Sequence, residues 1–230
     1  MARRYFSDPL PRPGRAQITG DVAHHLARVM RVRPGQEVTM FDGRGHECAV
    51  RVLGVESGTV AIEAAEPRPS PREPAVHLLL AFAPPKGARG EWLFEHGTEV
   101  GVSVFQPLRC ARSEPAGLGA ARQERWQRLA QAAAGQCDRA KVPEIRTPRP
   151  LDAWLEQDQL PAERYVASQS GPPLGPATGP EVVLAVGPPG GWTEAELAQL
   201  AAEGFATRAL GPLTLRSETA ALVGAARLLQ

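Results

Sequence analysis

The chain has 230 residues, of which 43% are hydrophobic and 22% are charged. This composition is typical of a folded protein with a sizeable core, and it excludes a disordered, fibrous or membrane-spanning chain. The longest apolar runs, VHLLLAFA and VVLAVG, are too short to cross a bilayer, and the segment MARRYFSDPLPRPG lacks the apolar stretch of a secretory signal. We therefore expect a cytoplasmic protein that makes no contact with a membrane.

The cysteines and histidines do not indicate a metal site. Cys48, Cys110 and Cys137 lie far apart with no CxxC spacing, which argues against a disulfide framework and against zinc. His24 and His25 are neighbours on a predicted helix, so their side chains point in different directions. We expect ordinary thiols and no metal.

The net charge of +1 hides an uneven distribution along the chain. Residues 1–51 carry nine arginines against five acids, and residues 109–149 carry eight arginines and one lysine against four acids. Residues 150–230 carry four arginines against nine acids. The two basic segments are candidate phosphate-contacting surfaces, although a GC-rich genome would produce the same excess of arginine.

The N-terminal part of the chain predicts one helix followed by strands. The spacing of apolar residues predicts a helix over 21–32, with Asp21 as its N-cap and Val22, Leu26, Val29 and Met30 on its buried face. Alternating segments separated by turn signals then predict a small antiparallel sheet or barrel. These strands are expected at 37–42, 47–55 and 59–66.

The stretch 67–74 holds four prolines in eight residues and is predicted to be a linker. After it, strands alternate with helices, which predicts a parallel sheet with helices on its faces. The strands are expected at 76–83, 102–108, 164–169, 181–187 and 206–211, and the helices at 90–101, 122–137, 193–204 and 218–230. The fold class is therefore α/β, or α+β for the whole chain.

The predicted helix 122–137 has an apolar stripe that includes Trp126 and arginines on its other faces. The arginines are Arg122, Arg125 and Arg128. They form either a solvated helix surface or a basic ridge that faces RNA.

The segment VVLAVGPPGGWTEAEL is a buried strand that breaks at Gly187–Gly191 and restarts as a helix. Thr193 and Glu196 have the spacing of a capping box. Glycines here allow close approach of a ligand beyond the carboxyl end of a strand, although a tight turn without a ligand has the same pattern. The phosphate-loop pattern GxxxxGK[ST] is absent from the segment.

The second glycine segment, ALGPLTLRSETAAL, leads from a short strand through Gly211 to a helix start. Ser217 is predicted to cap that helix, and Glu218 suits its positive end. Arg216, just before the cap, faces either a ligand or solvent.

Together the two segments resemble the SPOUT-class methyltransferases, and within them the bacterial family that methylates N3 of a uridine in 16S ribosomal RNA. That family has a GPEGG-type loop followed by LGxxxLRxETA, which stand here as GPPGG and LGPLTLRSETA. The resemblance also covers HHLARVMRVRPGQEVTMFDGRG, Lys86-Gly87, TEVGV at 98–102 and AAGQCDRAKVPEIR at 133–146.

The resemblance implies a PUA-like RNA-binding β-barrel over 1–70 and an α/β methyltransferase domain with a deep trefoil knot over 75–230. It implies S-adenosylmethionine as cofactor, 16S rRNA or the small ribosomal subunit as partner, and a homodimer. Arg216 and Glu218 are the candidate catalytic residues. The candidate cofactor-binding residues are Val186, Gly187, Pro188, Gly190, Gly191, Leu210, Gly211, Leu215, Ser217 and Thr219. The candidate RNA-binding residues are Arg4, Arg28, Arg31, Lys86, Gln136 and Arg139.

The sequence departs from the family pattern at two places. Pro189 replaces the glutamate of the GPEGG loop, and the KGDR-like segment reads KGARGEW. Two other functions stay open at this point: methylation of a ribose 2′-hydroxyl, and non-catalytic RNA binding or ribosome assembly.

Overall fold

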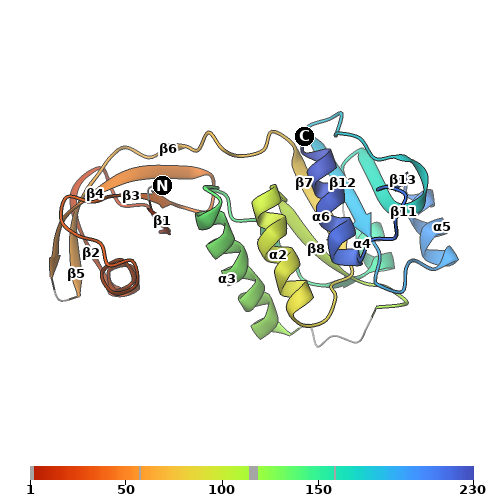
Figure 1. Ribbon diagram of the computed structural model, residues 1–230, viewed down its shortest axis with the longest axis horizontal. Coiled ribbons are helices and arrows are strands. Elements are labelled where there is room, and N and C mark those ends of the chain that lie inside the picture. Colours follow the sequence, from red (N-terminus) through yellow and green to blue (C-terminus); the bar gives the residue numbers. More distant parts are fainter. Residues whose placement is uncertain (1–2, 57, 114–118, 158) are drawn as a thin grey trace. The chain divides into compact units, whose positions relative to one another are not determined.

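The computed structural model describes residues 3–56, 58–113, 119–157 and 159–230. The chain divides into two compact units (Figure 1). Unit 1 comprises residues 1–73 together with 134–142, and unit 2 comprises residues 74–133 and 143–230. A short segment from the middle of the chain therefore belongs to the N-terminal unit.

Unit 1 is built on a mainly antiparallel sheet. Its elements are β1 (Arg3–Phe6), β2 (Gly14–Thr19), α1 (Gly20–His24), the π-helix η1 (His25–Val29), β3 (Glu37–Phe41), β4 (His46–Glu56), β5 (Thr59–Ala64) and β6 (Arg68–Pro69). The strand order is β1-β3-β4-β5-β2, with β6 paired to β4. The predicted antiparallel pairing of 37–42, 47–55 and 59–66 is confirmed. Alternate side chains of β3, β4 and β5 are buried under Leu26, as expected for a sheet with one face on a core.

The first helix differs from the prediction in two ways. It begins at Gly20 with Thr19 as N-cap, so Asp21 lies in the first turn, and its prediction as N-cap is wrong. The helix then widens to a π-turn, in which the Met30 N–H donates to the His25 carbonyl at 2.9 Å. A π-turn shifts the angular spacing of side chains, which explains why Val29 is 64% exposed although the helical period predicted it to be buried.

Unit 2 is a parallel sheet covered by helices. Its strands are β7 (His77–Phe82), β8 (Val104–Arg109), β9 (Glu144–Ile145), β10 (Arg149–Pro150), β11 (Glu163–Pro173), β12 (Glu181–Val186) and β13 (Ala206–Ala209). Its helices are α2 (Ala88–Val100), α3 (Ala120–Gln136, whose last residues belong to unit 1), α4 (Leu151–Gln157), α5 (Glu194–Ala202) and α6 (Ser217–Leu228). The strand order is β10-β8-β7-β12-β11-β13, with β9 paired to β8, and every described pairing is parallel. The predicted α/β class is confirmed.

Both faces of this sheet are buried, which explains why its strands read as continuous apolar runs. Trp154 of α4 and Leu200 of α5 pack on one face against Leu79 and Val183. On the other face α6 and α2 lie side by side, as Figure 1 shows.

An aromatic cluster joins α2 and α3 to the sheet. Phe94 of α2 is fully buried and stacks on Trp126 of α3, with ring centroids 4.4 Å apart. It also contacts Phe82 of β7 and Phe105 of β8. The apolar stripe that the sequence predicted on α3 is therefore the face that packs against the core.

We expect Phe94→Ala to lower the free energy of unfolding by about 3–5 kcal/mol, because it removes a fully buried ring and leaves a cavity. Trp92→Ala, on the partly exposed face of the same helix, should cost about 1 kcal/mol. Urea unfolding followed by circular dichroism measures both values. Equal losses for the two variants would contradict the assigned packing.

Candidate functional site

The site begins at the carboxyl ends of three neighbouring parallel strands. β12 is paired with β11, and β11 with β13, so the loops that leave these strands meet at one edge of the sheet. This edge is where ligands bind in open parallel sheets. The two glycine segments that the sequence singled out, 187–191 and 210–216, are two of these loops.

The capping box at the start of α5 fixes the first loop. The Thr193 hydroxyl accepts from the Glu196 N–H at 3.2 Å, and Glu196 Oε2 accepts from the Thr193 N–H at 2.8 Å. Glu196 is buried, and its Oε1 accepts the Ala111 N–H at 2.7 Å, which attaches the helix start to the segment after β8. The predicted T-x-x-E capping box is confirmed.

Arg112 holds the backbone of the same loop from outside. Its Nη1 donates to the carbonyl oxygens of Gly190 at 3.0 Å and Trp192 at 3.3 Å. Gly191 has a positive φ of 72°, a conformation that L side chains rarely adopt. The loop is thus shaped by backbone contacts and a glycine.

Burial shapes the chemistry of the neighbouring thiol. Burial, and secondarily the negative charge of Glu196, raise the pKa of Cys110 to about 12. Cys110 is therefore a protonated, unreactive thiol at neutral pH.

Close contact with the sheet positions the second loop. Gly224 of α6 lies against Leu184 of β12, where an added Cβ would come within 2.5 Å of the leucine side chain. The loop before α6 turns at Gly211, which has a φ of 145°. The prediction that Ser217 caps α6 is wrong, because the helix begins at Ser217 and its N-cap residue is Arg216, without a side-chain cap bond. Ser217 Oγ instead donates to Glu218 Oε2 at 3.2 Å.

The two loops enclose a cavity of about 550 Å³ within unit 2. It has the size of a pocket for a small-molecule ligand. Its predicted wall residues are Val186, Gly187, Pro188, Gly191, Leu210, Gly211, Leu215, Arg216, Ser217 and Glu218. Two predicted residues lie beside it: Gly190 bonds Arg112 through its carbonyl, and Thr219 is half-buried on α6.

Several wall residues were not among the predicted catalytic or cofactor-binding residues. They are Arg89, Ala167, Ser168, Gln169, Pro189, Trp192, Leu197, Leu213, Thr214 and Ala220. The sequence could have indicated Gln169, because it ends a predicted strand. In the structure its amide donates to the Thr214 hydroxyl at 3.0 Å. Arg89 belongs to a helix distant in sequence, and the usable signal for it was its place in the KGDR-like segment, which reads KGARGEW here.

Two polar groups of the cavity wall are buried. Glu218 is buried, and Arg89 Nη1 lies 3.9 Å from its Oε1. Trp192 Nε1 is buried and has no hydrogen-bond partner among the described residues. A buried indole N–H normally has a partner, so this unpaired donor is unusual.

The candidate RNA-binding residues fall into two groups. Arg28, Arg31, Lys86 and Gln136 are exposed. The side chain of Arg4 is 7% exposed and forms an ion pair with Glu47 (2.9 Å), and Arg139 is buried against Glu73 (3.2 Å). Contact of either buried guanidinium with RNA would require these ion pairs to open.

Two further features concern the described residues as a whole. They contain no group of three or more His, Cys, Asp or Glu side chains that could hold a metal ion. No helix among them is long and apolar enough to span a membrane.

Comparison with known proteins connects this cavity to a family. An RNA methyltransferase domain model matches residues 71–229, and an RNA methyltransferase PUA domain model matches residues 18–64. The ribosomal RNA small subunit methyltransferase E of Bacillus subtilis is 30% identical over 89% of this chain and 86% of its own length. The chain belongs to the ribosomal RNA small subunit methyltransferase E family. A relative with the same name from Synechocystis is 32% identical over 92% of this chain and 71% of its own length.

Solved structures agree with this family membership. The ribosomal RNA small subunit methyltransferase E of Neisseria gonorrhoeae, solved bound to S-adenosyl methionine, superposes with a TM-score of 0.88 at 28% identity and covers 98% of this chain and 96% of its own. A putative methyltransferase of Legionella pneumophila, solved with bound SAM, gives a TM-score of 0.85 at 26% identity, with coverage of 98% and 96%. The family predicted from the two glycine segments is confirmed.

We expect Thr193→Val to cost about 1 kcal/mol of folding stability, because it removes the hydroxyl of the capping box. Thr193→Ser keeps the hydroxyl and should unfold close to the native chain. Urea unfolding of the three proteins checks this expectation. If the serine variant lost as much stability as the valine variant, the hydroxyl would not be the stabilising group.

Proposed function

We propose that the chain binds S-adenosylmethionine in the cavity between loops 187–191 and 210–216 and methylates N3 of a uridine in 16S ribosomal RNA. The observation that carries the proposal is the position of the cavity, which lies between the two segments that link the chain to its family. Two relatives solved with this cofactor have the same fold over nearly their whole length.

The residues of the cavity fit the cofactor. Val186, Leu210 and Leu215 supply apolar wall for the adenosine, and the buried Trp192 Nε1 and the loop backbone supply donors. The buried Glu218 carboxylate favours a positive charge in the cavity. When bound, the cofactor supplies a methyl group on a positively charged sulfur.

Pro189 lies in the wall of this cavity and leaves it open. The loop is held by Arg112, by Glu196 and by its own backbone, none of which needs a glutamate at position 189. This arrangement favours an active enzyme over a non-catalytic RNA-binding protein.

We assign charge stabilisation to Arg216. Uridine N3 loses a proton in the reaction, and negative charge spreads onto its two carbonyl oxygens. The exposed Arg216 guanidinium at the mouth of the cavity can donate to those oxygens. Glu218 either accepts the N3 proton or fixes the cofactor, and its contacts with Ser217 and Arg89 favour the second role.

The finer features implied by the family belong to the same proposal. They are the trefoil knot in unit 2, barrel closure of the unit 1 sheet, the homodimer and action in the cytoplasm on the small ribosomal subunit. The domain assignment is also part of it, with RNA binding in 1–70 and methyl transfer in 75–230. Among the candidate RNA contacts, Arg28, Arg31, Lys86 and Gln136 are proposed to contact phosphate, and their exposure supports this proposal.

Labelled methyl transfer to small ribosomal subunits that lack the modification tests the proposal, with the product mapped by mass spectrometry. We expect label as N3-methyluridine, and a loss of about 10²–10³-fold in kcat for Arg216→Ala, the size seen when one charge-stabilising donor is removed. Arg227→Ala, in the last turn of the same helix, should keep near-native activity.

Two results would count against these assignments. Label on a ribose hydroxyl would replace the uridine chemistry with 2′-O-methylation. Equal activity of Arg216→Ala and the native chain would remove Arg216 from the reaction.

A further inference from the structure

Unit 1 carries a basic surface that lies outside all the candidate RNA-binding residues. It consists of Arg44, Arg68, Arg72 and Lys141, and we call it the linker-side basic surface. The segments that supply it are far apart in the sequence, and backbone pairing joins them. Strand β6 pairs with β4, which places Arg68 opposite Glu47, and Lys141 forms bridges with Gly43 and Arg44.

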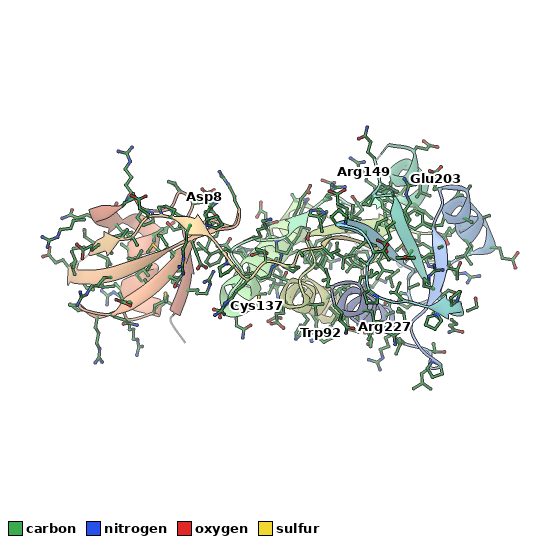
Figure 2. All side chains as sticks on the ribbon, turned by 90° about the horizontal axis from the view of Figure 1, so that it is seen from above. Asp8, Trp92, Cys137, Arg149, Glu203 and Arg227 are labelled. Atoms are coloured by element: carbon green, nitrogen blue, oxygen red, sulfur yellow. The ribbon has the colours of Figure 1, made fainter. Side chains whose placement is uncertain are left out.

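The arginines of this surface are more exposed than the acids with which they pair. Arg44 bonds Asp8 at 2.7 Å, and its side chain is 74% exposed against 35% for the aspartate. Figure 2 shows Asp8 on the surface of unit 1. Arg68 bonds Glu47 at 3.4 Å, with exposures of 74% and 9%.

Arg72 repeats this arrangement. It pairs with Asp138, and the exposures are 62% for the arginine and 21% for the aspartate. A partner that approaches this face therefore meets more guanidinium than carboxylate surface, although the paired acids almost balance the formal charge.

Ion pairs of Arg4 and hydrogen bonds of Glu73 hold these groups in position. Arg4 lies between Glu47 and Asp138, at 2.9 Å and 3.9 Å, and its side chain is 7% exposed. Glu73 Oε1 accepts the backbone N–H groups of Ala140 and Lys141 at 2.7 and 2.8 Å. Arg4 and Glu73 thus fix the loop that presents Lys141 and Asp138.

We propose that the linker-side basic surface binds the sugar-phosphate backbone of the substrate RNA, as a contact additional to Arg28 and Arg31. The inference rests on the proposed function for the identity of the RNA. Carboxylates fix the arginine stems before binding, which reduces the side-chain entropy lost on binding. A guanidinium has more N–H donors than one carboxylate contact uses, so donors remain for phosphate oxygens.

Two other arginines of unit 1, Arg15 and Arg51, lack this arrangement. Arg15 lies 3.9 Å from Glu63, and both side chains are well exposed, at 81% and 50%. Arg51 sits opposite Glu37 on one side and Glu63 on the other. An RNA that approached these two arginines would meet exposed carboxylates as well, which makes them a matched control.

The test is the salt dependence of binding between the full chain and a fluorescent 16S rRNA transcript. The logarithm of the binding constant falls linearly as the logarithm of the salt concentration rises. Each lost phosphate contact should reduce the magnitude of this negative slope, here called the slope, by about 1. We expect Arg44→Gln/Arg68→Gln/Arg72→Gln to lower the slope by about 2–3 and to weaken binding at least about tenfold. Arg15→Gln/Arg51→Gln should leave slope and affinity close to native.

Two variants guard against loss of folding. Lys141→Gln leaves the buried ion pairs in place and should lower the slope by about 1. Arg44→Lys/Arg68→Lys/Arg72→Lys keeps the charges and should keep most of the slope. Unchanged slopes in both the triple glutamine variant and Lys141→Gln would overturn the inference.

The outcomes separate this inference from the proposed function. A native chain that binds the transcript while all the surface variants bind equally well overturns the surface alone. A native chain with no affinity for the transcript overturns both. Displacement of the RNA by poly-glutamate at equal charge concentration would assign the surface to an acidic protein instead.

Discussion

The parallel pairing of β12 between β7 and β11 is the constraint on which the site of unit 2 depends. Because these strands run in the same direction, the loops after β12 and β13 leave the sheet at one edge although twenty or so residues separate them. Burial of both sheet faces fixes the strands, and Gly224 allows α6 to pack closely on β12. The cavity is thus a consequence of the sheet order.

In unit 1, ion pairs and hydrogen bonds made by charged side chains fix the structure in a comparable way. Glu73 lies in a proline-rich stretch that the sequence predicts to be a linker, yet its carboxylate holds Arg139 and two backbone N–H groups of the 138–141 loop. Breaking one partner of such a buried pair leaves an uncompensated charge, which is strongly destabilising. This physical role accounts for the burial of Arg4 and Arg139, which the sequence suggested as RNA contacts.

Local patterns predicted most of the fold. The apolar runs of β7 and β12, the alternation in β4 and the Thr193–Glu196 spacing each depend on residues close in the chain, and the structure confirms them. The π-turn at His25–Val29 was not predicted, because it breaks the α-helical spacing of apolar residues from which helices are predicted. The place of Arg89 in the cavity wall and the insertion of 134–142 into unit 1 were not predicted, because both depend on tertiary contacts.

The family resemblance added what local physics could not. A GPPGG loop or a capped helix with an arginine before it is equally compatible with a structural turn, and only their combination indicated a methyltransferase. The structure adds the cavity between them and the buried Trp192 Nε1 and Glu218 in its wall. Sequence and structure therefore support the same site.

Hydrogen exchange of the backbone amides with and without S-adenosylhomocysteine tests the central claim most directly. The account predicts slower exchange in 187–192 and 210–219 on addition of the ligand, and unchanged exchange in the β2 and β5 strands of unit 1. Protection confined to other segments, or no protection at saturating ligand, would contradict the assignment of this cavity as the cofactor site.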